Sequence, residues 1–186
     1  MAMKTELIVI DDFYYDPDSV REYALSQNFH VLGNYPGSRT KNLINDDTKN
    51  AIQEIVRPYS GEVTNWLDGP EGYTGAFQLT TSQDRSWVHS DDYNNWAGVL
   101  YLTPDAPIEG GTGFFRSKID GSIRGKAYNN LPGGDFTKWE LVAEVGNVYN
   151  RLILFAADQW HSSLQYFGDS IYNGRLTQVF FFHTEQ

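Results

Sequence analysis

The first sixty residues alternate short apolar runs with polar turns, in a pattern that predicts one strand and two helices. Residues 7–10 are four aliphatic residues followed by two aspartates, which predicts a short buried strand. Residues 18–28 carry apolar side chains at helical spacing behind an Asp-Pro-Asp start. A turn is expected at 34–38, where Pro and Gly are adjacent. A second helix is predicted over 46–56, with one aliphatic face and with Pro58 ending it.

From about residue 61 the apolar positions fall in shorter stretches that are rich in Thr and aromatic residues, which predicts strands. Aromatic residues make up 15% of the chain and fit a pleated sheet well. Residues 118–137 are rich in Gly and Asn and predict a long loop. Many short strands joined by polar turns favour a mainly β sandwich or barrel-like roll. The expected strands are 72–82, 87–92, 97–103, 113–117, 140–148, 151–156, 162–167 and 175–183.

The charge and the cysteine content exclude several classes of protein. Lys and Arg number 14 against 24 Asp and Glu, so the formal net charge is −10. An acidic chain is poorly suited to the phosphate backbone or to anionic membrane surfaces, so we expect no nucleic-acid or membrane partner. The chain has no Cys, which removes disulfides, zinc–thiolate sites and thiol nucleophiles together.

The N-terminus offers no targeting signal. Its apolar run of four, residues 7–10, is too short for the apolar region of a signal peptide or for a membrane span. We therefore expect a soluble intracellular protein located in the cytoplasm.

The histidines carry the strongest chemical pattern. In Trp87-Val88-His89-Ser90-Asp91, residues two apart on a strand share one face, so His89 and Asp91 project together. An imidazole beside a carboxylate supplies two ligands of the facial triad that suits non-haem Fe(II), and another His must supply the third. His161 opens a predicted strand and is the candidate. The other two histidines, His30 and His183, are expected to have structural roles.

The second element of this hypothesis is a residue that binds the far carboxylate of the co-substrate. Arg175 opens the last predicted strand, and the planar fork of a guanidinium pairs well with a carboxylate. Thr177 shares its face and adds a hydroxyl donor, whereas Leu176 faces the other side. Arg151 is the rival anchor.

The stretch from His89 to Phe182 resembles the Fe(II)/2-oxoglutarate-dependent oxygenases, in particular the prolyl-4-hydroxylase-like branch and its small bacterial and phage members. The resemblance rests on the order of motifs along the chain, which covers about half of the sequence. It implies a double-stranded β-helix, a jelly roll of two facing sheets. The motifs are His89-Ser90-Asp91, 98–102, 110–114, 146–155, Trp160-His161 and 174–177.

The same resemblance implies one domain over 1–186, with a helical support region at 1–60 and the double-stranded β-helix at 61–186. It implies that His89, Asp91 and His161 bind iron. It assigns the distal carboxylate of 2-oxoglutarate to Arg175, with Thr177 and Tyr101 as hydroxyl donors, and the wide gap before Arg175 predicts an enlarged turn at 168–173. The carboxylate of Asp91 favours hydroxylation, because family members that halogenate have a small residue there.

The expected activity is hydroxylation of an amino-acid side chain, such as a peptidyl proline, or of a small metabolite, with conversion of 2-oxoglutarate to succinate. Fe(II), 2-oxoglutarate and O2 are the implied cofactors, with ascorbate as an optional addition. The substrate is a small molecule or a peptide, and the oligomeric state stays open. The alternative is a non-catalytic, cupin-like β-roll that binds a metal or a sugar, which the aromatic-rich sheet would suit.

Weaker candidates surround this set. Trp87 and Trp160 adjoin proposed ligands and could line the site, and Tyr35 and Arg39 could reach the substrate. The loop at 118–137 is a candidate lid, because such loops often close over active sites.

Overall fold

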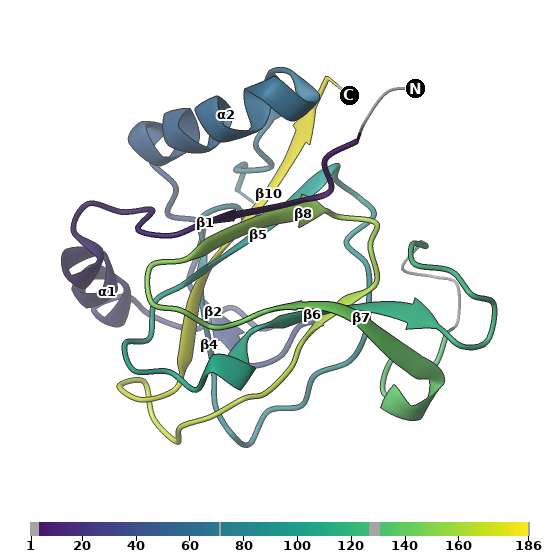
Figure 1. Cartoon of the computed structure of the whole chain (residues 1–186). Coiled ribbons are helices and arrows are strands. Elements are labelled where there is room, and N and C mark those ends of the chain that lie inside the picture. Colours follow the sequence, from purple (N-terminus) through teal and green to yellow (C-terminus); the bar gives the residue numbers. More distant parts are fainter. Residues whose placement is uncertain (1–3, 71, 127–130, 186) are drawn as a thin grey trace.

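Two antiparallel sheets form the body of the molecule, which is a computed structural model that describes residues 4–70, 72–126 and 131–185 (Figure 1). The larger sheet has the order β1–β8–β5–β10–β4–β2, with β3 paired to β10, and the smaller has the order β7–β6–β9. The strands are β1 Leu7–Ile10, β2 Ser38–Arg39, β3 Val63–Asn65, β4 Phe77–Thr80, β5 Trp96–Tyr101, β6 Thr112–Ser117, β7 Trp139–Val145, β8 Leu152–Ala156, β9 His161–Ser163 and β10 Arg175–Thr184.

The helices lie against the outer face of the larger sheet (Figure 1). They are α1 Pro17–Leu25 and α2 Asp46–Ser60, and short 3-10 turns span Ile108–Gly110 and Phe136–Lys138. Ile52 and Val56 of α2 pack with the sheet in one buried cluster. The predicted mainly β jelly roll with supporting N-terminal helices is therefore confirmed, while the single domain over 1–186 and its division into a support region and a core near residue 60 stay predictions.

The long strand β10 separates the two cores by strict alternation. Leu176, Phe180 and Phe182 face the helices and are fully buried. Val179 and Phe181 point the opposite way, into the space between the two sheets. Because successive side chains of a strand face opposite sides, Arg175 and Thr177 must also point between the sheets, as predicted.

Both helices begin at capping residues that the sequence supplies. The Asp16 side chain accepts from the amide of Ser19, and that of Asn45 accepts from the amide of Thr48. The prediction that Pro58 ends the second helix is wrong, because the helix continues to Ser60. Pro58 lacks only the N–H that would bond the carbonyl of residue 54, and this part of the helix surface faces water.

Three of the predicted strands differ clearly from the structure. The first, predicted over 72–82, is paired only at 77–80, because Gly75 has a φ of 81° and breaks the extended chain. The second, over 162–167, is paired only at 161–163, after which the chain leaves the sheet. The third, over 87–92, is wrong as a strand, since His89 forms an isolated bridge with His161. A turn at Asp91 ends that pairing, with the Asn94 amide bonded to its carbonyl.

Asn150 joins the N-terminal segment to the sheet. Its side chain accepts from the Tyr14 amide at 2.9 Å and donates to the Tyr14 carbonyl at 2.8 Å. Its own amide donates to the carbonyl of Tyr101 at the end of β5. Asn150 is 4% exposed and adopts a φ of 63°, a conformation that Asn tolerates better than most residues.

No helix among the described residues combines the length and the apolar character that crossing a membrane requires.

We expect Asn150→Gly to lower the free energy of unfolding by about 2–4 kcal/mol, because two backbone groups of Tyr14 lose their partners. Asn150→Ala should cost about 1–2 kcal/mol more, since alanine is strained at a φ of 63°. Urea denaturation measures both. Asp105 is exposed with a φ of 53°, so Asp105→Gly is the matched control and should be no less stable than wild type. Wild-type stability in Asn150→Gly would show that this clamp contributes nothing.

Candidate metal centre and its cavity

Three side chains from two distant parts of the chain converge between the sheets. Each of His89, Asp91 and His161 offers a ligand atom, and these atoms all lie within 4.8 Å of one another. An Asp91 carboxylate oxygen lies 3.4 Å from Nε2 of His161, and the other lies 3.9 Å from Nε2 of His89. The sequence prediction placed these residues together, and the structure brings them together.

Backbone pairing fixes this convergence. The amide of each histidine bonds to the carbonyl of the other, at 3.0 and 2.8 Å. The amide of Asp91 bonds to the carbonyl of Ala157, the residue directly after β8. These three bonds hold the His89–Asp91 segment between β9 of the smaller sheet and the end of β8 of the larger sheet, and the two side chains share a face although the segment is not a regular strand.

The imidazoles are oriented by their Nδ1 atoms. Nδ1 of His89 lies 3.0 Å from the Trp87 carbonyl, and Nδ1 of His161 lies 2.8 Å from the Gln159 carbonyl. A carbonyl only accepts, so both Nδ1 atoms donate, and Nε2 is the free atom on the side of Asp91. This arrangement is typical of metal-binding histidines, whose second nitrogen is fixed by a hydrogen bond.

The electrostatic balance favours the protonation states that a cation requires. Burial lowers the pKa of His89, and the neighbouring His161 lowers it further, so the neutral imidazole is favoured. Burial alone would raise the pKa of Asp91, but contact with His161 and the nearby cationic groups hold it below its ordinary value. Two imidazole nitrogens and one carboxylate are the donor set that non-haem Fe(II) prefers, so the residues fit such an ion.

Arg175 is a buried cation with an unsatisfied nitrogen. It is 3% exposed, and its Nε donates to the carbonyl of Gly110 at 2.7 Å. Its Nη2 is buried and has no hydrogen-bond partner. Burying a guanidinium without an anionic partner costs roughly several kcal/mol, so this position favours binding of an anionic ligand. A carboxylate that bridges two N–H groups fits it.

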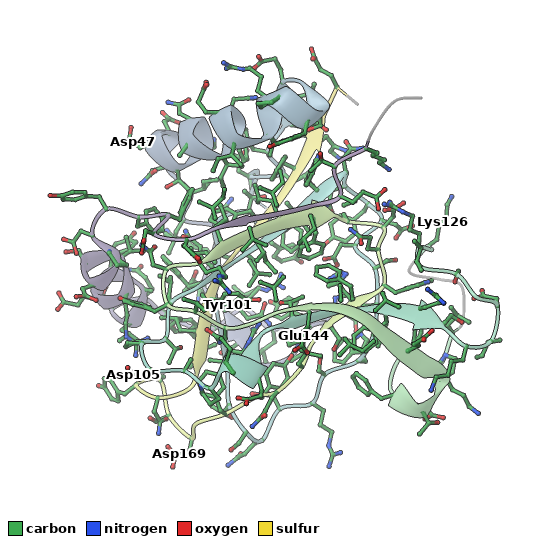
Figure 2. All side chains as sticks on the ribbon, viewed as in Figure 1. Asp47, Tyr101, Asp105, Lys126, Glu144 and Asp169 are labelled. Carbon is green, nitrogen blue, oxygen red and sulfur yellow. The ribbon has the colours of Figure 1, made fainter. Side chains whose placement is uncertain are left out.

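Thr177 and Tyr101 lie opposite each other on β10 and β5. Thr177 lines the cavity described below. The Tyr101 hydroxyl is fully buried and lies 2.8 Å from Oγ1 of Thr112, which also lines the cavity. Figure 2 shows Tyr101 deep inside the molecule, in contrast to Asp47 and Asp105 at its periphery. Tyr101 is not among the cavity-lining residues, but its ring lies 5.4 Å from Cζ of Arg175, and its role as a hydroxyl donor to 2-oxoglutarate stays a prediction.

One inner cavity connects the three converging side chains to Arg175. It has about 630 Å³ of empty space, including its open mouth. Asp91 and the two histidines line one part, and Arg175, Thr177 and Tyr166 line another, with apolar walls from Phe155 and Val179. The rival anchor Arg151 is not among the lining residues, and it pairs instead with Asp11 at 2.6 and 3.0 Å.

A second, outer pocket opens beside the same centre. His89, Asp91, Trp87 and Arg39 line both spaces, and Trp160 lines the outer one. From the loop at 118–137, Leu131, Gly133 and Gly134 border this pocket, whereas residues 127–130 of the predicted lid lie outside the described residues.

Sequence reasoning missed Thr112 and Gln78 and gave Arg39 little weight. Thr112 lies within the 110–114 motif, for which the resemblance to the family implies no role of this residue. Gln78 lies in a predicted strand and points into the inner cavity, where its amide oxygen accepts from Nε of Arg39. The one sequence signal for Gln78 is that it is a polar residue inside a predicted strand.

The remaining histidines have local partners. Nδ1 of His30 lies 3.0 Å from the carbonyl of Asn28, and Nδ1 of His183 lies 3.0 Å from Oδ1 of Asn95. The enlarged turn predicted at 168–173 is present. There the Asn173 side chain accepts from the amides of Asp169 and Ser170, and Gly168 has a φ of 74°.

Comparison with solved structures shows which fold this is. One similar structure is HygX from Streptomyces hygroscopicus with nickel, 2-oxoglutarate and hygromycin B bound. Its TM-score is 0.62 and its sequence identity is 13%, and the match covers 95% of this chain and 82% of that one. The non-haem α-ketoglutarate-dependent epimerase SnoN from nogalamycin biosynthesis follows (0.60, 13%, 96% and 78%). A third is a prolyl hydroxylase from Trichoplax adhaerens in complex with a hypoxia-inducible-factor peptide fragment (0.55, 12%, 97% and 84%). The fold is therefore that of the Fe/2-oxoglutarate oxygenases.

Sequence comparison gives the family. No curated protein matches the chain. A family model described as a family of unknown function (DUF6445) matches residues 1–131, which is more than half of the sequence. On that match, the chain belongs to the DUF6445 family.

Proposed function

We propose that this protein is an Fe(II)- and 2-oxoglutarate-dependent oxygenase that hydroxylates its substrate. One observation carries the proposal: a single cavity has a His-Asp-His donor set in one part and a buried, partly unsatisfied guanidinium in another. A bidentate oxo-acid that binds a metal at one end and ends in a carboxylate uses both features. The structural neighbours crystallised with nickel or Fe3+ and 2-oxoglutarate support this choice.

In this proposal His89, Asp91 and His161 hold the metal, and the iron, 2-oxoglutarate and O2 together supply the oxidising chemistry. These three side chains would hold the ion and leave it room to bind the oxo-acid. The Nδ1 bonds to Trp87 and Gln159 keep both Nε2 atoms directed at the ion without further reorganisation.

Arg175 binds the distal carboxylate of 2-oxoglutarate through its free Nη2, while Gly110 fixes the guanidinium through Nε. The hydroxyls of Thr177 and Tyr101 are the further donors to this carboxylate, and the Tyr101 hydroxyl also lies against Oγ1 of Thr112. Phe155, which packs against His161, and Val179 give the cavity apolar walls that exclude water. Water exclusion strengthens the charge pairing and protects the reacting centre.

A metal- or sugar-binding roll without catalysis explains less of the site. It gives a role to the donor set, but it gives no reason to bury the Arg175 guanidinium with an unsatisfied Nη2 at the same cavity.

We expect His161→Ala to weaken binding of Ni(II), used as an oxygen-stable substitute for Fe(II), by at least about 100-fold. Even substitutions that only support a metal ligand cost about 10–100-fold. Isothermal titration calorimetry under nitrogen measures the affinity. The matched control is His183→Ala, which removes a histidine outside the cavity and should leave the affinity unchanged. Unaltered nickel binding by His161→Ala would remove His161 from the ligand set.

Arg175→Gln should raise the apparent dissociation constant for 2-oxoglutarate about 10–100-fold, because a charge-assisted pair is lost. The measurement is an anaerobic titration of the Fe(II)-loaded protein, followed by the weak visible band of the bidentate oxo-acid complex. Arg116→Gln is the matched control, since Arg116 is exposed on β6 and pairs with Glu140.

Two outcomes of that titration would contradict the proposal. If Fe(II) binds but 2-oxoglutarate produces no band in the wild type, the protein is a metal-binding roll. If Arg175→Gln titrates like wild type, the anchor lies elsewhere. Succinate formation under air, absent in His161→Ala, completes the test.

A further inference from the structure

A second buried arginine lies on the other side of the proposed metal centre. Arg39 ends β2, is only 7% exposed, and lines both the inner cavity and the outer pocket. Among the described residues, no carboxylate lies within 4.0 Å of its guanidinium, although the chain as a whole is strongly acidic. Most buried arginines are paired, so this one is unusual.

The surroundings of Arg39 fix its plane and leave its ends free. Its Nε donates to Oε1 of Gln78 at 2.9 Å, and Nε2 of Gln78 donates to the Pro36 carbonyl at 2.8 Å, which sets the amide orientation. The Tyr35 ring lies 3.8 Å from Cζ, in a cation–π contact. Neither terminal nitrogen donates to another side chain or carbonyl in the described parts of the chain.

The outer pocket therefore presents a positive charge that no carboxylate of the described residues contacts within 4.0 Å, although Asp91 lies near enough to act on it through space. Among its described lining residues, Arg39 and Asp91 carry formal charges, and Asp91 is committed to the proposed metal. Aromatic rings of Trp87, Tyr73 and Tyr93 form much of the remaining wall. This combination suits a guest with an anionic end and an apolar body.

We propose that the substrate oxidised at this centre is a small organic acid whose carboxylate pairs with Arg39, while its apolar part packs on the aromatic wall. The proposal rests on the proposed oxygenase function and narrows its substrate class. A guanidinium held in advance by Gln78 and Tyr35 loses little entropy on binding, and its fork matches a planar carboxylate. Within a peptide, only an Asp or Glu side chain or the C-terminus offers such a group, so this subsite does not suit a peptidyl proline and favours a free acid.

Arg39 and Arg175 have separate roles in this scheme. Arg175 lines the inner cavity but not the outer pocket, whereas Arg39 lines both. When 2-oxoglutarate fills the inner cavity, Arg39 stays accessible from the outer pocket. Loss of Arg39 should therefore change substrate binding and leave 2-oxoglutarate binding within about threefold of wild type.

The test uses two acid–amide pairs as probes: 3-phenylpropanoate with 3-phenylpropanamide, and hexanoate with hexanamide. They are titrated by ligand-observed NMR into protein saturated with Ni(II) and 2-oxoglutarate. We expect wild type to bind each acid at least about tenfold more tightly than its amide, as one charge-assisted pair requires. Arg39→Gln should bring this ratio near one, and Arg39→Lys should retain part of it.

Arg116→Gln is again the matched control and should keep the wild-type ratio. Failure of Arg39→Gln to fold, judged by circular dichroism, would leave Arg39→Lys and Gln78→Leu to decide, since both perturb the fork and should reduce the ratio. Equal binding of acid and amide by wild type would overturn the proposal, as would an acid preference that stays at the wild-type ratio in all of these variants. A loss of 2-oxoglutarate binding in Arg39→Gln as large as that in Arg175→Gln would also overturn it.

The same titration on metal-free Arg175→Gln separates this inference from the proposed function. An acid preference that depends on Arg39 in that protein supports the carboxylate subsite even if the protein never retains 2-oxoglutarate. If 2-oxoglutarate binds normally and no acid preference is found, only the present inference fails.

Discussion

The alternation of β10 is the constraint on which the site depends. Its helix-facing side buries Leu176, Phe180 and Phe182 completely, and burying such side chains stabilises the fold by about 1.5–3 kcal/mol each. Their sum, roughly 5–9 kcal/mol, exceeds the several kcal/mol that a desolvated guanidinium costs. A shift of register by one residue would expose the apolar set to the cavity, so the position of Arg175 is enforced by hydrophobic burial on the opposite face.

The same balance explains why two incompletely paired cations can persist in one small protein. Each is fixed at Nε by a single neutral acceptor, the Gly110 carbonyl for Arg175 and the Gln78 amide for Arg39. A carboxylate partner within the protein would lower the electrostatic cost but would compete with any anionic guest. The two unpaired arginines thus lower the stability of the free protein, and an anionic ligand that binds them offsets this cost. This pattern is typical of functional sites.

Much of this site was predictable because it follows local rules. Strand parity placed Arg175 and Thr177 on one face, and the spacing of His89 and Asp91 put two ligands together. The pairing of His89 with His161 is a long-range backbone contact, which no local pattern reveals. The unpaired state of Arg39 depends on the absence of nearby acids in space, and Pro58 stays helical because only a solvent-facing carbonyl loses its partner. These features arise from tertiary structure.

The net charge of −10 opposes the binding of acidic ligands at long range, but this repulsion is weak inside the pocket because of distance and solvent screening. Surface charges are screened over about 8–10 Å at physiological salt, so the acidic surface acts weakly inside a deep pocket. A guanidinium beside the binding position acts through a medium of much lower dielectric constant, where the same charge has several times the effect. Two cations that line one cavity can therefore attract two carboxylates into an acidic protein. The positions of the two cations then decide which carboxylate binds where. A compound that also chelates the metal binds in the inner cavity, and the cation of the outer pocket selects the second ligand.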